Sequence, residues 1–93
     1  MTFQEFLQSV SNSQPPKTTQ LLLALWYDKK GDWNKSHEIA QDIHTPEGSW
    51  IHAYLHRKEG DIWNADYWYR QAGQTRPSVS LDEEWEMIVK AFL

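Results

Sequence analysis

The chain has 93 residues, enough for one domain, and it contains six Trp, four Tyr and three Phe but no Cys. The absence of Cys excludes a disulfide framework and a thiolate metal site. The net charge is -4 and Lys and Arg are scattered, which argues against nucleic acid as a partner because such proteins present a basic patch. No apolar run approaches the roughly 20 residues of a membrane span, and the N-terminus shows no signal peptide. We therefore expect a cytoplasmic protein that binds no membrane.

The spacing of apolar residues predicts helices and no strand. Thr2 and Glu5 form a capping box that opens a short helix over about 2–11. Pro16 suits the first turn of a second helix, which is predicted to run to about Lys30. Apolar side chains point all round this second helix, so we expect it to be central and covered on most sides.

A Gly-Asp corner follows, in which Gly31 ends the second helix and Asp32 caps a third that reaches about Ile43. Thr45-Pro46 carries the start signal of a fourth helix, which is predicted to end at about Glu59. The third and fourth helices are therefore joined by a very short turn.

The corner recurs at Gly60-Asp61, and a fifth helix follows it and ends before Pro77. Ser80 and Glu83 form a second capping box, which opens a last helix. That helix is predicted to bury Leu81, Trp85, Ile88, Val89 and Phe92 and to turn Asp82, Glu83, Glu84 and Glu86 toward water. The prediction is an all-α domain of about six short helices.

The pattern of helix, Gly-Asp corner and helix therefore occurs twice. In the second copy small and aromatic residues follow in the order Ala53, Gly60-Asp61-Ile62, Ala65, Tyr69, Ala72 and Pro77. This order resembles the tetratricopeptide repeat (TPR), a family of stacked helical hairpins. The first copy matches less fully, with Ala24, Gly31-Asp32-Trp33, Ser36, Ala40 and Ile43.

The resemblance implies two TPR-like hairpins, at about 16–43 and 46–77, with capping helices at about 2–11 and 80–92. It also implies an adaptor that binds a protein or peptide. The chain departs from the family in length, because the family period is about 34 residues and only His44 separates the two hairpins. The stretch from His52 to Tyr69 is also similar to one in small uncharacterised bacterial and fungal proteins, a likeness that carries no activity.

A partner is predicted to bind through aromatic side chains and Arg, the residue types enriched at interface hot spots. The predicted residues are Trp50, Tyr54, Arg57, Trp63, Asn64 and Tyr67. The first three lie on the first helix of a hairpin, which lines the concave side of such a stack. The other three lie on the second helix, off its predicted core face. Two alternatives are that the terminal helices cover these aromatics, or that the aromatics form the face of a homodimer.

Metal or small-ligand binding is the alternative function. His52 and His56 are four residues apart on one predicted helix, a spacing that can hold a metal ion, and Glu59 is a third predicted ligand. Either His37 or His44 lies nearby on the preceding helix or turn. Histidine pairs at this spacing are common, and a polar stripe packed against aromatics explains them equally, since no His-Glu-x-x-His motif or Cys accompanies them.

Nothing in the chain points to an enzyme. It has no phosphate-binding loop, no nucleophile elbow and no carboxylate pair in apolar surroundings. An acid–base pair of His56 with a nearby carboxylate stays open. We therefore expect a binding protein without a cofactor.

Overall fold

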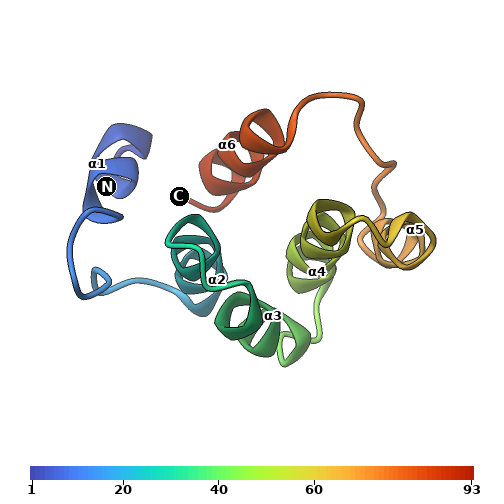
Figure 1. The fold of residues 1–93 in the computed structure, drawn as a ribbon, viewed down its shortest axis with the longest axis horizontal. Coiled ribbons are helices and arrows are strands. Elements are labelled where there is room, and N and C mark those ends of the chain that lie inside the picture. The colour runs from blue at the N-terminus through green and yellow to red at the C-terminus, as the bar shows by residue number, and fades with distance from the viewer.

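The computed structural model describes all 93 residues, which form six helices and no strand. Figure 1 shows them in chain order: α1 (Phe3–Ser9), α2 (Gln20–Lys29), α3 (Trp33–Gln41), α4 (Pro46–Glu59), α5 (Ile62–Gln71) and α6 (Leu81–Phe92). The predicted all-α class is therefore confirmed, as is the number of helices. None of them has the length and apolar character needed to cross a membrane.

Side-chain caps start the helices at the residues that the sequence indicates. Thr2 and Glu5 form the capping box of α1, in which the Glu5 N–H donates to Oγ1 of Thr2 over 3.1 Å. Asp32 and Asp61 cap α3 and α5 through their carboxylates. Gly60 precedes Asp61 with a φ of 90°, a left-handed conformation that Gly adopts without strain. Both Gly-Asp corners therefore act as predicted.

Helix α2 starts later than predicted, at Gln20 instead of Pro16. Thr19 takes an extended conformation, and its hydroxyl accepts the N–H of Leu22 over 3.3 Å. Because this hydroxyl satisfies a free N–H of the first turn, the helix begins after Thr19 and Pro16 stays in the loop. Helix α3 ends at Gln41, so the first hairpin spans 20–41.

The two hairpins, α2–α3 and α4–α5, pack side by side, with α4 against both α2 and α3 (Figure 1). The turn that joins them covers residues 42–45 and is longer than predicted because α3 ends at Gln41, yet it packs closely on α4, where Gly48 in the first turn makes room for it. A Cβ at Gly48 would lie only 2.2 Å from the carbonyl oxygen of Ile43. The turn can therefore fold back on α4 only because position 48 has no side chain.

Helix α6 lies across α2 and α4, the first helices of both hairpins, and α1 packs on α6 (Figure 1). This differs from the expected arrangement, in which the terminal helices cap the two ends of the stack. The apolar face of α6 directs the packing, since Trp85 is buried and its Nε1–H donates to the carbonyl of Leu25 over 3.0 Å. Helix α5 packs on α4 and reaches α6 through the Tyr69 hydroxyl on its inner side, so its outer face stays uncovered.

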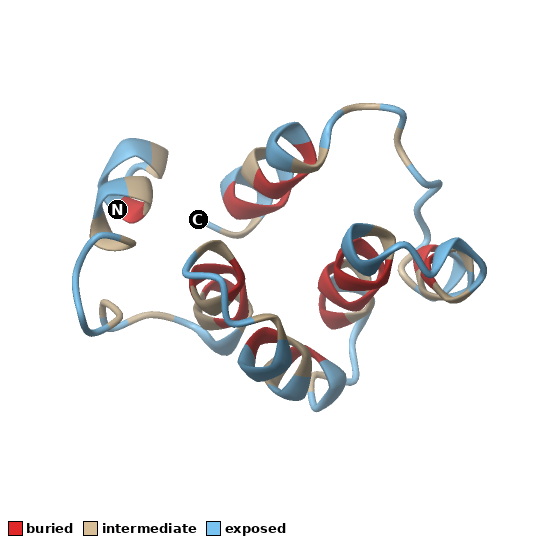
Figure 2. Ribbon diagram, viewed as in Figure 1, coloured by how far each residue is buried: buried red, intermediate tan, exposed pale blue.

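The core lies where α2, α4 and α6 meet, and Figure 2 shows the buried residues on the faces that these helices turn toward one another. Its largest apolar members include Leu25, Trp26, Ile51, Leu55, Trp85 and Ile88. A smaller cluster of Ala53, Ala65 and Tyr69 joins α4 to α5. The two alanines allow these helices to approach closely, which places the side chains at the α3–α4–α5 junction within reach of one another.

Candidate functional site

Helix α6 covers the face of α4 that was predicted to line a groove. Tyr54 is only 2% exposed, and its hydroxyl donates to Oδ2 of Asp28 over 2.9 Å. Trp50 Nε1 donates to Oε2 of Glu84 over 3.1 Å, and the Arg57 guanidinium donates to Oε1 of Glu84 over 2.7 Å. These three residues join α4 to α2 and α6, so the predicted groove has to be corrected: a helix of the same chain fills it.

Glu84 is the centre of the contact with α6. Its side chain is completely buried and also accepts the hydroxyl of Tyr69 in α5, over 2.7 and 2.8 Å. Burial and this hydrogen bond raise the pKa of Tyr69 far above its usual range, so the hydroxyl remains a donor. The prediction that Glu84 points to water is wrong. Glu84 lies three residues after Leu81 and four before Ile88, on the apolar stripe itself, and that spacing could have revealed it.

A second buried carboxylate ties the two hairpins together. Asp28 in α2 accepts the Tyr54 hydroxyl and, through Oδ1, the ammonium of Lys58 in α4 over 2.9 Å. Burial and the Asp28 charge raise the pKa of Tyr54 far above its usual range. Both carboxylates are thus occupied by side chains of the same chain and hold the fold together.

Three histidines meet where α3, α4 and α5 pack together. His37 comes from α3 and His52 and His56 come from α4, and one ring nitrogen of each lies within 4.8 Å of the other two. The Nε2 atoms of His37 and His52 are 3.0 Å apart. His52 and His56 are each 7% exposed, so this face of α4 is buried. His44 is exposed and stands outside the cluster.

Glu59 and Asn64 lie beside His56. Glu59 Oε1 is 2.6 Å from Nδ1 of His56, so the carboxylate accepts the N–H of that nitrogen. The amide nitrogen of Asn64, from α5, lies 3.5 Å from Nε2 of His56. The structure therefore brings the predicted His52, His56, Glu59 and Asn64 together. It adds His37, which the sequence offered only as one of two neighbours.

Two tryptophans pack on the outer sides of these imidazoles. Trp33 stacks on His37 with ring centroids 4.9 Å apart and an interplanar angle of 10°. Trp68 stacks on His52 at 4.1 Å and 21°. The indole N–H of Trp33 donates to the carbonyl of Leu55 over 2.9 Å, which holds that ring in place. The histidine rings are thus confined to one orientation before any ligand is present.

Burial keeps the imidazoles of His37 and His52 uncharged. It lowers the pKa of His52 to about 4, and the neighbouring His37 and His56 add to the shift. Burial, and then the proximity of His56, also lowers the pKa of His37, against an opposing effect of Glu59. At neutral pH His37 and His52 are therefore neutral, each with one ring nitrogen that can accept a proton, a hydrogen bond or a metal ion.

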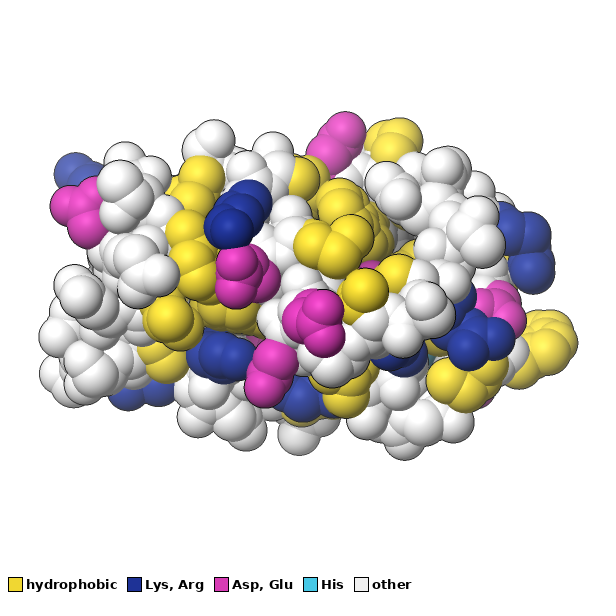
Figure 3. Space-filling view, turned by 90° about the horizontal axis from the view of Figure 1, so that it is seen from above, with side chains coloured by type: hydrophobic (Ala, Val, Ile, Leu, Met, Phe, Trp, Pro, Cys, Tyr) yellow, Lys and Arg dark blue, Asp and Glu magenta, His cyan; other side chains and the backbone are white.

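The outer face of α5 carries the remaining predicted residues. Trp63 is 82% exposed and Tyr67 is partly exposed. Arg70 follows one turn later, so the three side chains form a row along the helix. Over the face drawn in Figure 3, by contrast, acidic, basic and apolar side chains are interspersed without an extended patch of one charge.

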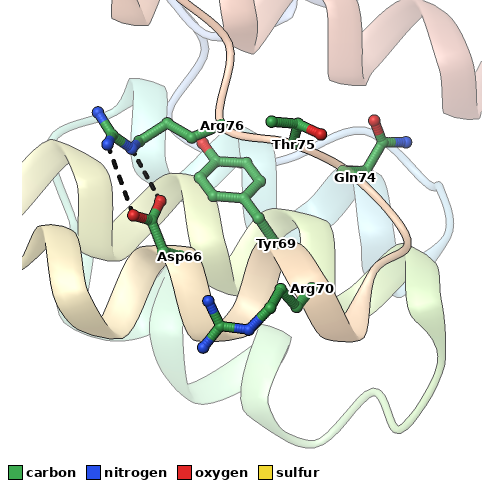
Figure 4. A pocket seen from close by; sticks show the side chains of 6 residues that line it. All are labelled: Asp66, Tyr69, Arg70, Gln74, Thr75 and Arg76. Carbon is green, nitrogen blue, oxygen red and sulfur yellow. Dashed lines mark hydrogen bonds and ion pairs between the residues drawn. The ribbon is translucent and has the colours of Figure 1, made fainter.

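A pocket of about 260 Å³ opens at the end of this row, where the chain after α5 folds back. It is lined by Asp66, Tyr69, Arg70, Gln74, Thr75 and Arg76. Figure 4 shows Arg76 paired with Asp66, the Nε–Oδ1 distance being 2.8 Å, whereas the Arg70 side chain makes no hydrogen bond or ion pair. The pocket is lined by two guanidinium groups and one carboxylate, and this excess of positive charge favours the binding of an anionic group. The sequence did not reveal this pocket because it forms only where residues 74–76, after α5, fold back beside that helix.

The predicted site residues are thus divided among three places. Trp50, Tyr54 and Arg57 of α4 are occupied in contacts with α2 and α6. His52, His56, Glu59 and Asn64 lie together at the histidine cluster, and Trp63 and Tyr67 lie on the surface of α5. Comparison with known proteins adds no further guide, because no protein-family model, no curated protein and no solved structure matches this chain.

Proposed function

We propose that the protein is a small TPR-like interaction domain that binds an acidic peptide segment of another protein along the outer face of α5. The observation that carries the proposal is the row of Trp63, Tyr67 and Arg70, in which an 82% exposed indole precedes a guanidinium without a partner. Aromatic residues and Arg dominate interface hot spots. A large apolar side chain left in water is explained by a partner that covers it.

The packing of the helices supports this location. Helix α5 packs on α4 with its inner side, from which Tyr69 also reaches α6, whereas α6 fills the concave side on which the family resemblance suggested a groove. A peptide laid along α5 meets no other helix of the chain. The proposal therefore keeps the interaction role predicted from the sequence and, of the predicted residues, uses Trp63 and Tyr67 on α5 and no longer those on α4.

Charge complementarity specifies the partner. Arg70 and Arg76 outnumber Asp66 in the pocket, and the planar fork of Arg70 is free to pair with a carboxylate. Trp63 and Arg70 are separated by about 10 Å along the helix, a distance that about three residues of an extended peptide span. The preferred segment has Leu or Phe about three residues from Asp or Glu.

The proposal is tested with fluorescein-labelled synthetic peptides that carry Leu or Phe three residues from Glu, and with a matched set that carries Lys in place of Glu. We expect fluorescence anisotropy to show binding of the acidic set only. Trp63→Ala should weaken this binding by more than about 1 kcal/mol, or roughly fivefold. Arg70→Glu should remove the preference for the acidic set.

Met87→Ala and Lys17→Glu make matched changes at exposed positions away from α5 and should leave binding unchanged. Trp63→Ala should also leave the melting temperature unchanged, since the indole is on the surface. Failure to bind either peptide set, or binding that Trp63→Ala does not weaken, contradicts the proposal. A dimer in light scattering that Trp63→Ala converts to monomer would instead assign this face to a second copy of the chain.

A further inference from the structure

The histidine cluster stands apart from the outer face of α5 and from the proposed peptide binding. His37, His52 and His56 present ring nitrogens that all lie within 4.8 Å of one another, on two helices packed side by side. The carboxylates Asp28 and Glu84 are already occupied by side chains of the chain, as described above. In the cluster, by contrast, Nε2 of His37 and Nε2 of His52 share one hydrogen bond with each other, and a metal ion bound to both would displace its proton.

The separation of these nitrogens matches a metal site of the zinc class. Zinc binds imidazole nitrogen at about 2.0–2.1 Å, which places two nitrogens of a tetrahedral site about 3.3 Å apart. The Nε2 atoms of His37 and His52 are 3.0 Å apart. His52 and His56 are one turn apart on α4 and present their rings on the same side. All three nitrogens lie within 4.8 Å of one another, so a shift of at most about 1.5 Å brings them to the tetrahedral separation.

The residues around the cluster suit a metal ligand set. A histidine that binds a metal usually donates its other N–H to a carboxylate, which fixes the ring and raises its basicity. Glu59 accepts the Nδ1–H of His56 over 2.6 Å in this way, so Nε2 is the nitrogen available to a metal. Trp33 and Trp68 stack on the other two rings and hold their orientation.

We propose that His37, His52 and His56 form a three-imidazole site for a divalent transition-metal ion, Zn²⁺ being the expected ion. Neutral imidazoles favour zinc, copper and nickel over magnesium and calcium, which prefer oxygen ligands. Three protein ligands leave one position of a tetrahedral ion for water or another small ligand. Glu59, predicted from the sequence as a ligand, becomes a positioning residue that acts through His56.

The experiment uses the untagged full chain at pH 7, because a polyhistidine tag would bind the same ions. Isothermal titration with ZnCl₂ should give one ion per chain, and the melting temperature should rise with Zn²⁺ concentration. Co²⁺ in place of Zn²⁺ should give the visible absorption of a tetrahedral nitrogen-ligated ion. Glu59→Gln should weaken Zn²⁺ binding by about 10-fold or more, and His37→Gln should weaken it further.

His44→Gln is the matched control, since His44 is exposed and outside the cluster, and it should leave Zn²⁺ binding unchanged. His52→Gln removes a buried ring, so circular dichroism must first show that the variant folds. If His52→Gln does not fold, Zn²⁺ binding by His37→Gln is the deciding measurement, because His37 is only half-buried. Absence of saturable Zn²⁺ binding, or binding that His37→Gln leaves intact, would overturn the proposal and identify the histidines as packing residues.

Discussion

Among single residues, Glu84 of α6 stands out because its hydrogen bonds join three helices. Its completely buried carboxylate accepts hydrogen bonds from Trp50 and Arg57 in α4 and from Tyr69 in α5. Removing a charge from water is unfavourable unless an opposite charge and hydrogen bonds offset it. Glu84 therefore specifies one position of α6 against the second hairpin, α4–α5, because a displaced α6 would leave both the carboxylate and the Arg57 guanidinium unpaired.

Glu84→Gln keeps the size of the side chain and removes the charge, which leaves Arg57 without its ion pair. We expect the free energy of unfolding to fall by about 3 kcal/mol, as for other broken buried pairs. Urea unfolding followed by circular dichroism measures the change. Glu86→Gln is the control, since Glu86 pairs with Lys90 on the surface of the same helix and its loss should change stability by less than about 0.5 kcal/mol. Equal unfolding midpoints for Glu84→Gln and the unchanged protein would refute the role given to this carboxylate.

Among the helices, α4 is notable for its first turn, which packs tightly against the preceding connection. Thr45 caps it by accepting the N–H of Gly48 over 3.2 Å, and the end of the preceding turn lies directly over Gly48. The connection between the hairpins can pack this closely on α4 because Gly48 has no side chain. The position that would hold a side chain in an ordinary helix is occupied by the backbone of Ile43.

Gly48→Ala should destabilise the protein by about 2–3 kcal/mol, because the added methyl group meets a backbone carbonyl that cannot move aside easily. The effect opposes the ordinary preference of helices for Ala over Gly, which makes the sign of the change informative. Thermal unfolding of Gly48→Ala and of the neighbouring Ser49→Ala compares a crowded position with an uncrowded one in the same turn. A Gly48→Ala variant more stable than the unchanged protein would show that the turn relaxes freely.

For the molecule as a whole, stability should be uneven because the helices have different numbers of neighbours. Helix α4 packs against α2, α3, α5 and α6, whereas α1 packs on α6, and α5 packs on α4 and reaches α6 through the Tyr69 hydroxyl. Local opening is easiest where few buried contacts must be broken. The two proposed sites differ accordingly: the peptide face lies on the exposed α5, and the histidine cluster lies against the well-packed α4.

Amide hydrogen exchange measured by NMR tests this difference. We expect the slowest exchange in α4 and α2, and faster exchange in α1 and in the last turns of α5. Zn²⁺ should slow exchange in α3, which is joined to α4 through His37, if the metal site is correct. Uniform protection of all six helices in the metal-free protein would show that it opens only as one unit.

The amino-acid sequence alone was sufficient for the local elements. Caps such as Thr2, Asp32 and Asp61 and the left-handed Gly60 act through contacts within a few residues, so their roles can be deduced without a structure. The start of α2 was predicted at Pro16, whereas the capping hydroxyl of Thr19 starts the helix at Gln20. The i, i+4 spacing likewise placed His52 and His56 on one face of α4.

The tertiary structure decided which faces are free. The Arg57–Glu84 pair joins residues 27 positions apart and the Trp85–Leu25 hydrogen bond joins residues 60 apart, and no local pattern predicts such contacts. Helix α6 thereby covers Trp50 and Tyr54, and α5 is left exposed. His37 reaches the other two histidines for the same reason, because only the packing of α3 on α4 brings their rings together.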